Sequence, residues 1–311
     1  MDVLADVLSL AGVRGTLGAR IEAGERWGWW AAGIPGAAFH AVTSGTAWLA
    51  PRGQAPRELM PGDIVLLPRG TDHALASDAA TVARTGPDNS SGYEQAGGAL
   101  VRIGSGPTRT HILCAHYEYD RAVSTQVFSL LPDLVHIRAH NDGGGLDDTV
   151  RLLSRELATP RLATSVVLDS LVDILLVQLL RAWLDGAPEP APHPSWLGVL
   201  RDPIVGTAVT RLHAEPARAW TNVALASEVA VSPATLLRRF GTVLGETPGA
   251  YLTRWRMDLA ARRLRDTDDS LEGIAQSVGY TSVYAFSRAF SRARALPPGR
   301  YRTDARSAQS G

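Results

Sequence analysis

The chain has 311 residues, of which 45% are hydrophobic and 20% are charged. It is therefore long enough for two globular domains and too apolar to be disordered. Its single cysteine, Cys114, excludes an internal disulfide framework. The longest apolar stretch, residues 166–180, is interrupted by Asp169, Asp173 and Gln178, which excludes a membrane-spanning helix. The first ten residues lack the basic start and the small-residue cleavage site of a secretory signal, so we expect a cytoplasmic protein.

The formal net charge of zero hides an asymmetry between two parts of the chain. Residues 1–200 contain 15 arginines and 21 acidic residues, whereas residues 201–311 contain 16 arginines and 10 acidic residues. The net charges are therefore −6 and +6, and every basic residue is an arginine because the chain has no lysine. This pattern suggests that only the second part meets a polyanion, although chance alone can produce a difference of this size.

Residues 15–140 are expected to form short strands. Glycine and proline recur between apolar runs such as Ile64–Leu67, and this regular spacing is typical of a β-sandwich or barrel. Residues 86–98 are expected to form a polar, glycine-rich loop. We therefore assign residues 1–145 to a β-barrel domain that binds a ligand or signal.

Residues 146–186 are expected to form two helices separated by Pro160. The second helix is apolar on more than one face, so it must pack against more than the edge of its own domain. Burial against the barrel and contact with a second copy of the chain both satisfy this requirement, and the second option predicts a homodimer. Residues 187–199 are rich in proline, which predicts a stiff, extended linker at the domain boundary.

Residues 200–305 are expected to be almost wholly helical, with a flexible tail at 306–311. Residues 225–240 and 274–290 form a near-repeat of short helix, tight turn and amphipathic helix, which is typical of a helix-turn-helix. The N-caps of these helices are expected at three places: Ser232 before Pro233, Ser270, and either Thr281 or Ser282. The expected fold class is therefore α+β and multidomain, with a β-barrel, linker helices and an all-α domain containing two helix-turn-helix units.

Many spaced positions of the basic part follow one pattern. They are Ser232, Pro233, Leu236, Arg238, Phe240, Gly245, Pro248, Tyr251, Arg256, Ala260, Leu264, Ile274, Ala275, Gly279, Tyr280, Phe286, Arg288, Phe290, Pro298, Tyr301 and Arg302. This pattern covers about a third of the chain and resembles the DNA-binding domain of the AraC/XylS transcription regulators. Ala295 departs from it, because the family usually has glycine there.

The resemblance implies a regulator that binds double-stranded DNA through two recognition helices, in major grooves about one helical turn apart. The family's base-contacting positions fall on Ala234, Leu237, Arg238, Val283, Tyr284 and Arg288. Arginine can form a bidentate bond to guanine, whereas alanine, leucine and valine can only meet a thymine methyl, so we expect modest direct readout helped by DNA shape. Neighbouring arginines are expected to face phosphates or solvent; they are Arg239, Arg254, Arg262 and Arg263. RNA polymerase is a further expected partner if the regulator is an activator.

In the acidic part, Gly62, Pro68, Gly70 and His73 fit the spacing G-x5-P-x-G-x2-H, which resembles the second motif of cupin barrels. His40 lies in a degenerate first motif, which lacks the His-x-His and the glutamate that cupin enzymes use for iron or manganese. We therefore expect the signal-receiving domain of a regulator and not an enzyme. The alternatives are a cupin metalloenzyme of the dioxygenase or isomerase type with a helical appendage, and a metal-storage or scaffold protein.

A candidate metal site contains His40, His73, Cys114 and His116. Cys114 and His116 are two residues apart in an expected strand, so their side chains share one face. Three imidazoles and one thiolate suit a single closed tetrahedral Zn²⁺ site. Oxidation of the thiolate would remove one ligand, so such a site would also serve as a redox sensor.

Two other interpretations of this region are open. A lone buried cysteine is commonly a small hydrophobic side chain, and barrel histidines commonly bind backbone carbonyls. The signal is then an organic ligand in the barrel mouth, bound beside three aromatic side chains that could equally be core packing. They are Trp29, Trp30 and Trp48.

Overall fold

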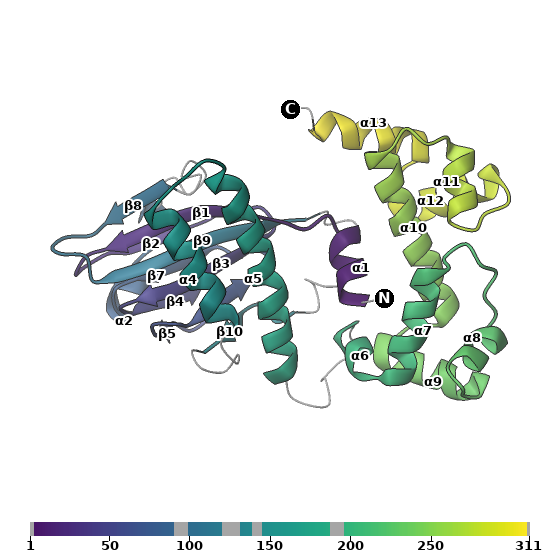
Figure 1. Ribbon diagram of the computed structural model, residues 1–311, viewed down its shortest axis with the longest axis horizontal. Helices are drawn as coiled ribbons and strands as arrows, with labels where there is room; N and C mark the ends of the chain where they lie inside the picture. Colours follow the sequence, from purple (N-terminus) through teal and green to yellow (C-terminus); the bar gives the residue numbers. More distant parts are fainter. Residues whose placement is uncertain (1–2, 90–98, 120–130, 139–144, 187–195, 310–311) are drawn as a thin grey trace. The chain divides into compact units, whose positions relative to one another are not determined.

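The computed structural model describes residues 3–89, 99–119, 131–138, 145–186 and 196–309 (Figure 1). These residues fall into two compact units. We call the described residues of 13–119 and 131–188 the sheet unit, and those of 1–12 and 189–311 the helical unit. None of the helices in the described ranges is long and apolar enough to cross a membrane.

The sheet unit is built from two β-sheets. The six-stranded sheet has the order β10-β6-β3-β9-β1-β8, and the four-stranded sheet has the order β2-β7-β4-β5. Neighbouring strands are antiparallel except β1 and β8, which are parallel. The strands are β1 (Arg14–Ala23), β2 (Gly28–Ala31), β3 (Ala37–Ser44), β4 (Ala47–Pro51), β5 (Arg57–Leu59), β6 (Ile64–Leu67), β7 (His73–Ala76), β8 (Ala99–Ile103), β9 (Thr110–Glu118) and β10 (Val135–Ile137). Two short helical segments, α2 (Ala79–Val82) and η1 (Pro87–Asn89), follow β7.

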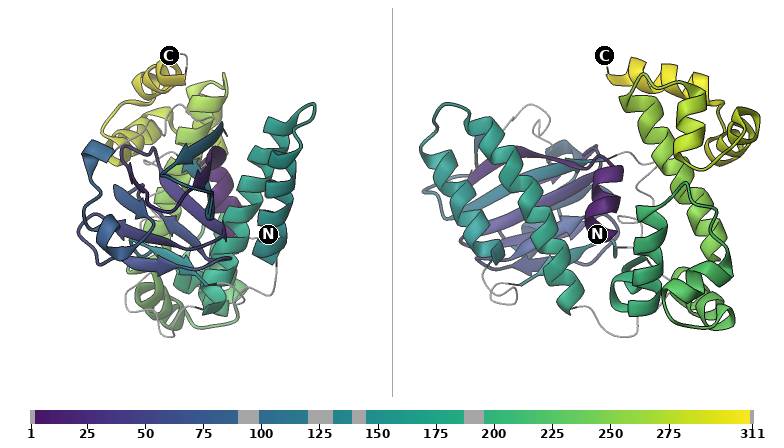
Figure 2. Two further views of the ribbon diagram at one scale, coloured as in Figure 1. Left: turned by 90° about the vertical axis from the view of Figure 1, so that its left-hand side faces the viewer. Right: turned by 45° about the vertical axis from the view of Figure 1, so that its right-hand side comes forward.

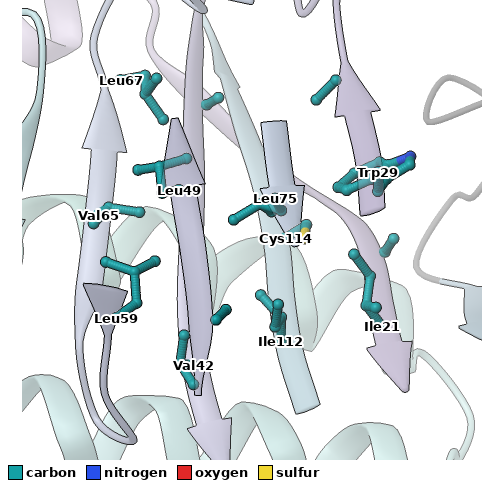
Figure 3. Close-up of a cluster of buried hydrophobic side chains, with 14 of the residues drawn as sticks. Ile21, Trp29, Val42, Leu49, Leu59, Val65, Leu67, Leu75, Ile112 and Cys114 are labelled. Carbon is teal, nitrogen blue, oxygen red and sulfur yellow. The ribbon is translucent and has the colours of Figure 1, made fainter. Parts of the chain in front are cut away.

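Apolar side chains from both sheets fill the space between them (Figure 3). Strand alternation selects these side chains: along β6, Val65 and Leu67 join the inner cluster, whereas Ile64 and Leu66 point to the outer face. Other members of the inner cluster are Ile21, Leu49, Leu59, Leu75, Ile112 and Cys114. The prediction of a two-layered β-structure in the first part of the chain is therefore confirmed.

Two helices, α4 (Gly145–Ala158) and α5 (Thr164–Gly186), cover the outer face of the six-stranded sheet (Figures 1 and 2). The buried Tyr117 of β9 donates its hydroxyl hydrogen bond to the Val172 carbonyl at 2.8 Å. The Gly15 amide donates to Asp173 Oδ1 at 2.6 Å, and a side chain at Gly15 would meet Val172 at 2.4 Å. The helix pair predicted at 146–186 is thus present, and its second helix packs closely on the sheet.

The helical unit contains nine described helices. They are α1 (Val3–Leu10), α6 (Trp196–Arg201), α7 (Pro203–Ala214), α8 (Asn222–Glu228), α9 (Pro233–Leu244), α10 (Pro248–Asp266), α11 (Leu271–Ser277), α12 (Val283–Arg294) and α13 (Pro298–Gln309). Two expected boundaries change. Residues 196–199 begin α6 instead of ending an extended linker, and residues 306–309 continue α13 instead of forming a tail. The rest of the linker, residues 187–195, lies outside the described residues.

Helix α1 packs on α7 and α10, although the sequence assigns residues 1–12 to the barrel domain. The Asp6 carboxylate lies 3.2 Å from His213 Nδ1 of α7, and Arg262 of α10 donates to Ser9 Oγ at 3.3 Å. The apolar face of α1 is buried and comprises Val3, Leu4, Val7 and Leu10. The described contacts of α1 are thus with the helical unit, and an eight-residue amphipathic segment carries no local signal of which unit buries it.

Serine side chains cap three of the four helices in the two helix-turn-helix pairs, α9, α11 and α12. Ser232 Oγ accepts from the Thr235 amide at the start of α9, and Ser270 Oγ accepts from the Gly273 amide at the start of α11. At α12 the cap is Ser282, not Thr281. Each cap satisfies a backbone donor that has no partner within its helix.

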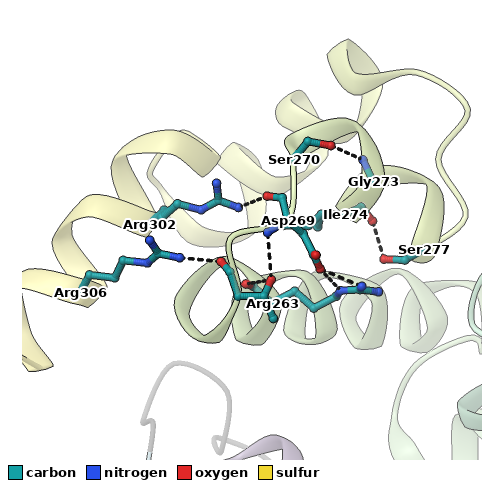
Figure 4. A network of polar contacts seen from close by, with 9 residues as sticks. Arg263, Asp269, Ser270, Gly273, Ile274, Ser277, Arg302 and Arg306 are labelled. Carbon is teal, nitrogen blue, oxygen red and sulfur yellow. Dashed lines mark hydrogen bonds and ion pairs between the residues drawn. The ribbon is translucent and has the colours of Figure 1, made fainter.

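Helix α13 holds the turn between α10 and α11 (Figure 4). Arg302 and Arg306 donate hydrogen bonds to the carbonyls of Asp269 and Thr267, respectively. Arg263 of α10 pairs with the Asp269 carboxylate at 2.8 Å. These contacts satisfy exposed carbonyls of the turn, and they fix the base of the second helix-turn-helix pair.

Candidate functional site

Helices α9 and α12 are the second helices of the two helix-turn-helix pairs, α8–α9 and α11–α12. Each buries one aromatic-rich face, with Phe240 in α9 and Phe286 and Phe290 in α12. The opposite faces carry the six residues expected to contact bases, of which Val283 is half-buried and the others are exposed: Ala234, Leu237, Arg238, Tyr284 and Arg288. The structure thus places the expected set on the outward faces of two equivalent helices.

The turns around these helices require residues in the left-handed region. Gly279 has φ +82° between α11 and α12, and a Cβ there would lie 2.7 Å from the Ala217 carbonyl. Gly245 has φ +71° after α9, and the equivalent residue after α12 is Ala295 with φ +57°. The family departure at Ala295 therefore keeps the turn, but it places an alanine where glycine is favoured.

Four arginines that were expected to face phosphates or solvent contact other side chains. The contacts are Arg239 with Asp202, Arg254 with Glu246, Arg262 with Ser9, and Arg263 with Asp269. The side chains of Arg239 and Arg263 remain 44% and 42% exposed, so they still face solvent, and contact with phosphate stays a prediction. Sequence alone cannot show such pairing, because Asp202 lies 37 positions from Arg239.

Three other arginines of the helical unit remain unpaired. The guanidinium groups of Arg238, Arg288 and Arg292 make no hydrogen bond or ion pair with any residue that the structure describes. All three are exposed, on α9 and α12. An unpaired guanidinium has five donors available in a rigid planar fork, which matches guanine edges and phosphate groups.

A chain of hydrogen bonds crosses the interior of the sheet unit. Cys114 Sγ lies 3.1 Å from His40 Nδ1, His40 Nε2 lies 2.7 Å from His73 Nε2, and His73 Nδ1 lies 2.7 Å from the Thr71 carbonyl oxygen. Cys114 is directly opposite His40 in the β3–β9 pairing, and His73 begins β7 in the other sheet. The three side chains are fully buried, and they connect the two sheets.

The carbonyl end of this chain fixes the position of each proton. The Thr71 oxygen can only accept, so His73 Nδ1 donates to it and His73 Nε2 accepts from His40 Nε2. His40 Nδ1 then accepts from the Cys114 thiol. Burial acts in the same direction, because it lowers the pKa of His40 well below its usual value, lowers the pKa of His73 to about 4, and raises the pKa of the Cys114 thiol. The chain is therefore complete with two neutral imidazoles and a protonated thiol.

The same geometry does not form a single metal shell. Cys114 and His73 contact opposite ring nitrogens of His40, so one ion cannot take a ligand atom from all three unless a side chain rotates. The fourth expected ligand, His116, is two residues further along β9, with Nε2 3.6 Å from a carboxylate oxygen of Glu118. Among the described residues, no group of three or more His, Cys, Asp or Glu side chains is arranged to hold a metal ion. Zinc binding therefore stays a prediction.

The three tryptophans considered as a ligand-binding group lie in two different clusters. Trp29 is buried in the cluster between the sheets, whereas Trp30 and Trp48 pack in a separate cluster that includes Val82 of α2. Adjacent residues of a strand point to opposite faces, which separates Trp29 from Trp30. These positions agree with the interpretation of the tryptophans as packing.

Local sequence patterns do not indicate two cavities that lie on the described part of the sheet unit. One, of about 350 Å³, lies between α4 and strands β3 and β6, and its lining includes Ala41, Thr43, Ile64, Val150 and Arg151. The other, of about 540 Å³, lies beside the edge strands β5 and β10 and is lined by Arg57, Glu58, Met60, Asp63, His136 and Arg138. Both volumes fall within the range of small-molecule sites. Residues from distant strands and helices create them, so no local pattern could have predicted them.

Comparison with known proteins covers both parts of the chain. The family model described as Cupin matches residues 2–185, and the one described as Helix-turn-helix domain matches residues 225–304. A protein of Streptomyces lividans named as an AraC-like transcription regulator is 37% identical over 97% of this chain and 98% of its own length. The HTH-type transcriptional regulator MtrA of Neisseria gonorrhoeae is 29% identical over 98% of this chain and 99% of its own length. Among solved structures, the DNA-binding domain of the transcriptional factor AdpA in complex with a target DNA is 27% identical, with a TM-score of 0.33, over 35% of this chain and 97% of that chain.

These similarities agree with the two units of the structure. The cupin match spans more than half of the chain, and the second match begins within α8 and includes α9, α11 and α12. The relatives that match nearly the whole chain are transcription regulators, so the alternative of a cupin metalloenzyme is not favoured. The chain belongs to the AraC-like transcription regulators, with a cupin domain followed by a DNA-binding helix-turn-helix domain, and it is not an enzyme.

Proposed function

We propose that this regulator binds double-stranded DNA with α9 and α12 in successive major grooves, and that its cupin domain receives the signal. The bases are contacted by Ala234, Leu237, Arg238, Val283, Tyr284 and Arg288. One observation carries this assignment. The guanidinium groups of Arg238 and Arg288 have no hydrogen-bond or ion-pair partner in the described chain, whereas neighbouring arginines such as Arg239 are paired with acidic side chains.

Arg238 and Arg239 provide a matched test of this assignment. Each change to glutamine removes one positive charge from α9, but only Arg238 is unpaired. The full chain first enriches a duplex from a randomised pool, and fluorescence anisotropy then measures affinity for that duplex and for a scrambled one. Arg238→Gln should cost about 1–3 kcal/mol on the enriched duplex and relax selectivity at one base pair. Equal losses for both variants on both duplexes would contradict the assignment.

We propose further that α4 and α5 form the contact of a homodimer. Several large apolar side chains are exposed on this helix pair and its connecting turn: Leu152, Leu162, Val166, Val167 and Ile174. Scattered exposed apolar residues are ordinary, but a group on one helix pair is typical of an interface. Ile174→Glu should shift the chain to monomer in sedimentation velocity. Leu100→Glu is the matched control, because Leu100 is 43% exposed on β8 and Ile174 is 46% exposed; a dimer that survives Ile174→Glu would refute this contact.

The signal is proposed to be a small molecule, a metal ion or an oxidant. A zinc site formed by His40, His73, Cys114 and His116 would hold about one zinc ion per chain. Elemental mass spectrometry of the reduced protein, purified without a histidine tag, measures this metal content. His73→Ala should then abolish the metal content. Oxidant sensing requires a reactive thiolate, whereas Cys114 is buried and hydrogen-bonded. Absence of metal together with slow thiol oxidation would leave an organic effector, for which the cavity beside α4 is the first candidate.

Whether the protein activates or represses transcription is proposed to depend on its contact with RNA polymerase. The amount of transcript made in vitro from a promoter that carries the enriched duplex distinguishes the two. An increase on addition of the protein identifies an activator that contacts the polymerase, and a decrease identifies a repressor. Because its target is chromosomal DNA, we propose that the protein acts in the cytoplasm.

A further inference from the structure

Helices α9 and α12 occupy equivalent positions in their helix-turn-helix pairs, but their exposed side chains differ. Both begin after a capping serine, Ser232 and Ser282, and both place an unpaired arginine at the sixth position after the cap. The second, sixth and tenth positions are Ala234, Arg238 and Thr242 in α9, and Tyr284, Arg288 and Arg292 in α12. Only α12 therefore has an aromatic ring one turn before this arginine and a second arginine one turn after it.

The Tyr284 ring lies beside the guanidinium group of Arg288. The distance from Arg288 Cζ to the ring centroid is 5.3 Å, which is within the range of a cation–π interaction. Tyr284 is 71% exposed, so its ring does not belong to the core of the unit. The ring restricts an arginine that has no hydrogen bond or ion pair in the described chain. Less side-chain entropy is then lost when Arg288 binds a base.

Arg292 continues the same row along α12. Residues 284, 288 and 292 lie on successive turns, about 6 Å apart along the axis, on the side opposite Phe286 and Phe290. A recognition helix contacts base edges with its amino-terminal residues, and Arg292 is two residues from the end of α12 at Arg294. Its exposed guanidinium is therefore placed to meet the DNA backbone instead of a base.

We propose that Tyr284 is a positioning residue that orients Arg288 toward a guanine, and that Arg292 is a phosphate contact. The second helix-turn-helix unit then contributes more affinity and more selectivity than the first. The inference about Tyr284 rests on the proposed base contact of Arg288, and the experiment separates the two.

The test uses the full chain and the duplex that it enriches, with each base pair substituted in turn. Tyr284→Phe keeps the ring and should keep selectivity within about twofold, whereas Tyr284→Leu should lose about two- to fivefold at the base pair that Arg288→Gln also relaxes. In the Arg288→Gln background, Tyr284→Leu should have no further effect at that base pair, whereas a base contact of Tyr284 itself would act at a different one. An equal loss with phenylalanine, or a loss at that base pair that persists in the Arg288→Gln background, would overturn the positioning role. If Arg288→Gln itself has no effect, the proposed base contact fails instead.

The converse test adds an aromatic ring to the first helix-turn-helix unit, which lacks one at this position. Ala234→Tyr places a ring at the equivalent position of α9, one turn before Arg238. Selectivity at the base pair contacted by Arg238 should rise by about two- to fivefold. Unchanged or lower selectivity would contradict the view that the missing ring distinguishes the two helices.

The phosphate contact of Arg292 has a separate readout. Arg292→Gln should weaken binding to the enriched and scrambled duplexes by the same factor, and it should reduce the slope of log affinity against log salt by about 0.9. Arg300→Gln is the control, because Arg300 is exposed on α13 and is paired with Asp304. An unchanged salt slope, or a loss confined to one base pair, would overturn this role of Arg292.

Discussion

A buried ion pair between Asp258 of α10 and Arg294 of α12 provides the sharpest test of how the second recognition helix is held. The two side chains are only 7% and 9% exposed. Breaking such a pair is costly because one charge loses its partner while it remains out of water, and the loss is about 3–5 kcal/mol. Asp258→Asn keeps the shape and removes the charge. We expect a loss near 3 kcal/mol in the free energy of unfolding, because the amide oxygen still accepts one hydrogen bond.

Urea unfolding of the full chain, followed by circular dichroism at 222 nm, measures this change. Asp304→Asn, which breaks an exposed pair with Arg300, is the matched control and should leave the midpoint unchanged. The double variant Asp258→Leu with Arg294→Met should recover most of the lost stability, because an apolar pair needs no compensation for buried charge. A loss below about 1 kcal/mol for Asp258→Asn would refute the reasoning, since it would show that the pair is not desolvated.

Three further predictions concern the helical unit. Ala295→Gly should raise the free energy of unfolding by about 0.5–1 kcal/mol in urea melts, because φ of +57° favours glycine, and a lower midpoint would contradict this. Ser282→Ala removes the cap of α12 and should cost about 1 kcal/mol in the same assay; no change would mean that the cap contributes nothing. Burial, followed by the charge of Arg254, lowers the pKa of His213 to about 3. The unfolded chain, with a histidine pKa near ~6.5, then binds the extra proton, so stability should fall as the pH drops from 6.5 toward 3, by up to roughly 1.4 kcal/mol per unit. The Asp6 carboxylate, 3.2 Å away, moderates this slope. His213→Phe should remove this contribution and leave that of the buried His40 and His73, whose pKa values are also lowered; an unchanged slope would disprove the assignment.

Much of the helical unit could be predicted because its signals are local. The serine before Pro233, the spacing of Phe286 and Phe290, and the glycine at 279 each specify a cap, a buried face or a turn within a few residues. The exposed positions of α9 and α12 follow from the same periodicity. The two-layered sheet unit could be predicted as a class for the same reason, since short apolar runs alternate with glycine and proline.

The features that sequence reasoning missed depend on contacts between distant residues. Asp6, for example, meets His213 across 207 positions. The expected proximity of His40, His73 and Cys114 is present, but their arrangement is not the expected one. The strand parity that placed Cys114 and His116 on one face was sound, but parity says nothing of which ring nitrogen of His40 faces the thiol. The zinc hypothesis assumed convergence of four ligands, whereas the structure shows a hydrogen-bonded chain of three.

Hydroxyl-radical footprinting of the full chain on its enriched duplex tests the central claim most directly. Two helix-turn-helix units that read successive major grooves should protect two patches on one face of the duplex, about 10–10.5 base pairs apart. Arg238→Gln should weaken one patch and Arg288→Gln the other. A single patch, or two patches that weaken together in either variant, would contradict the account.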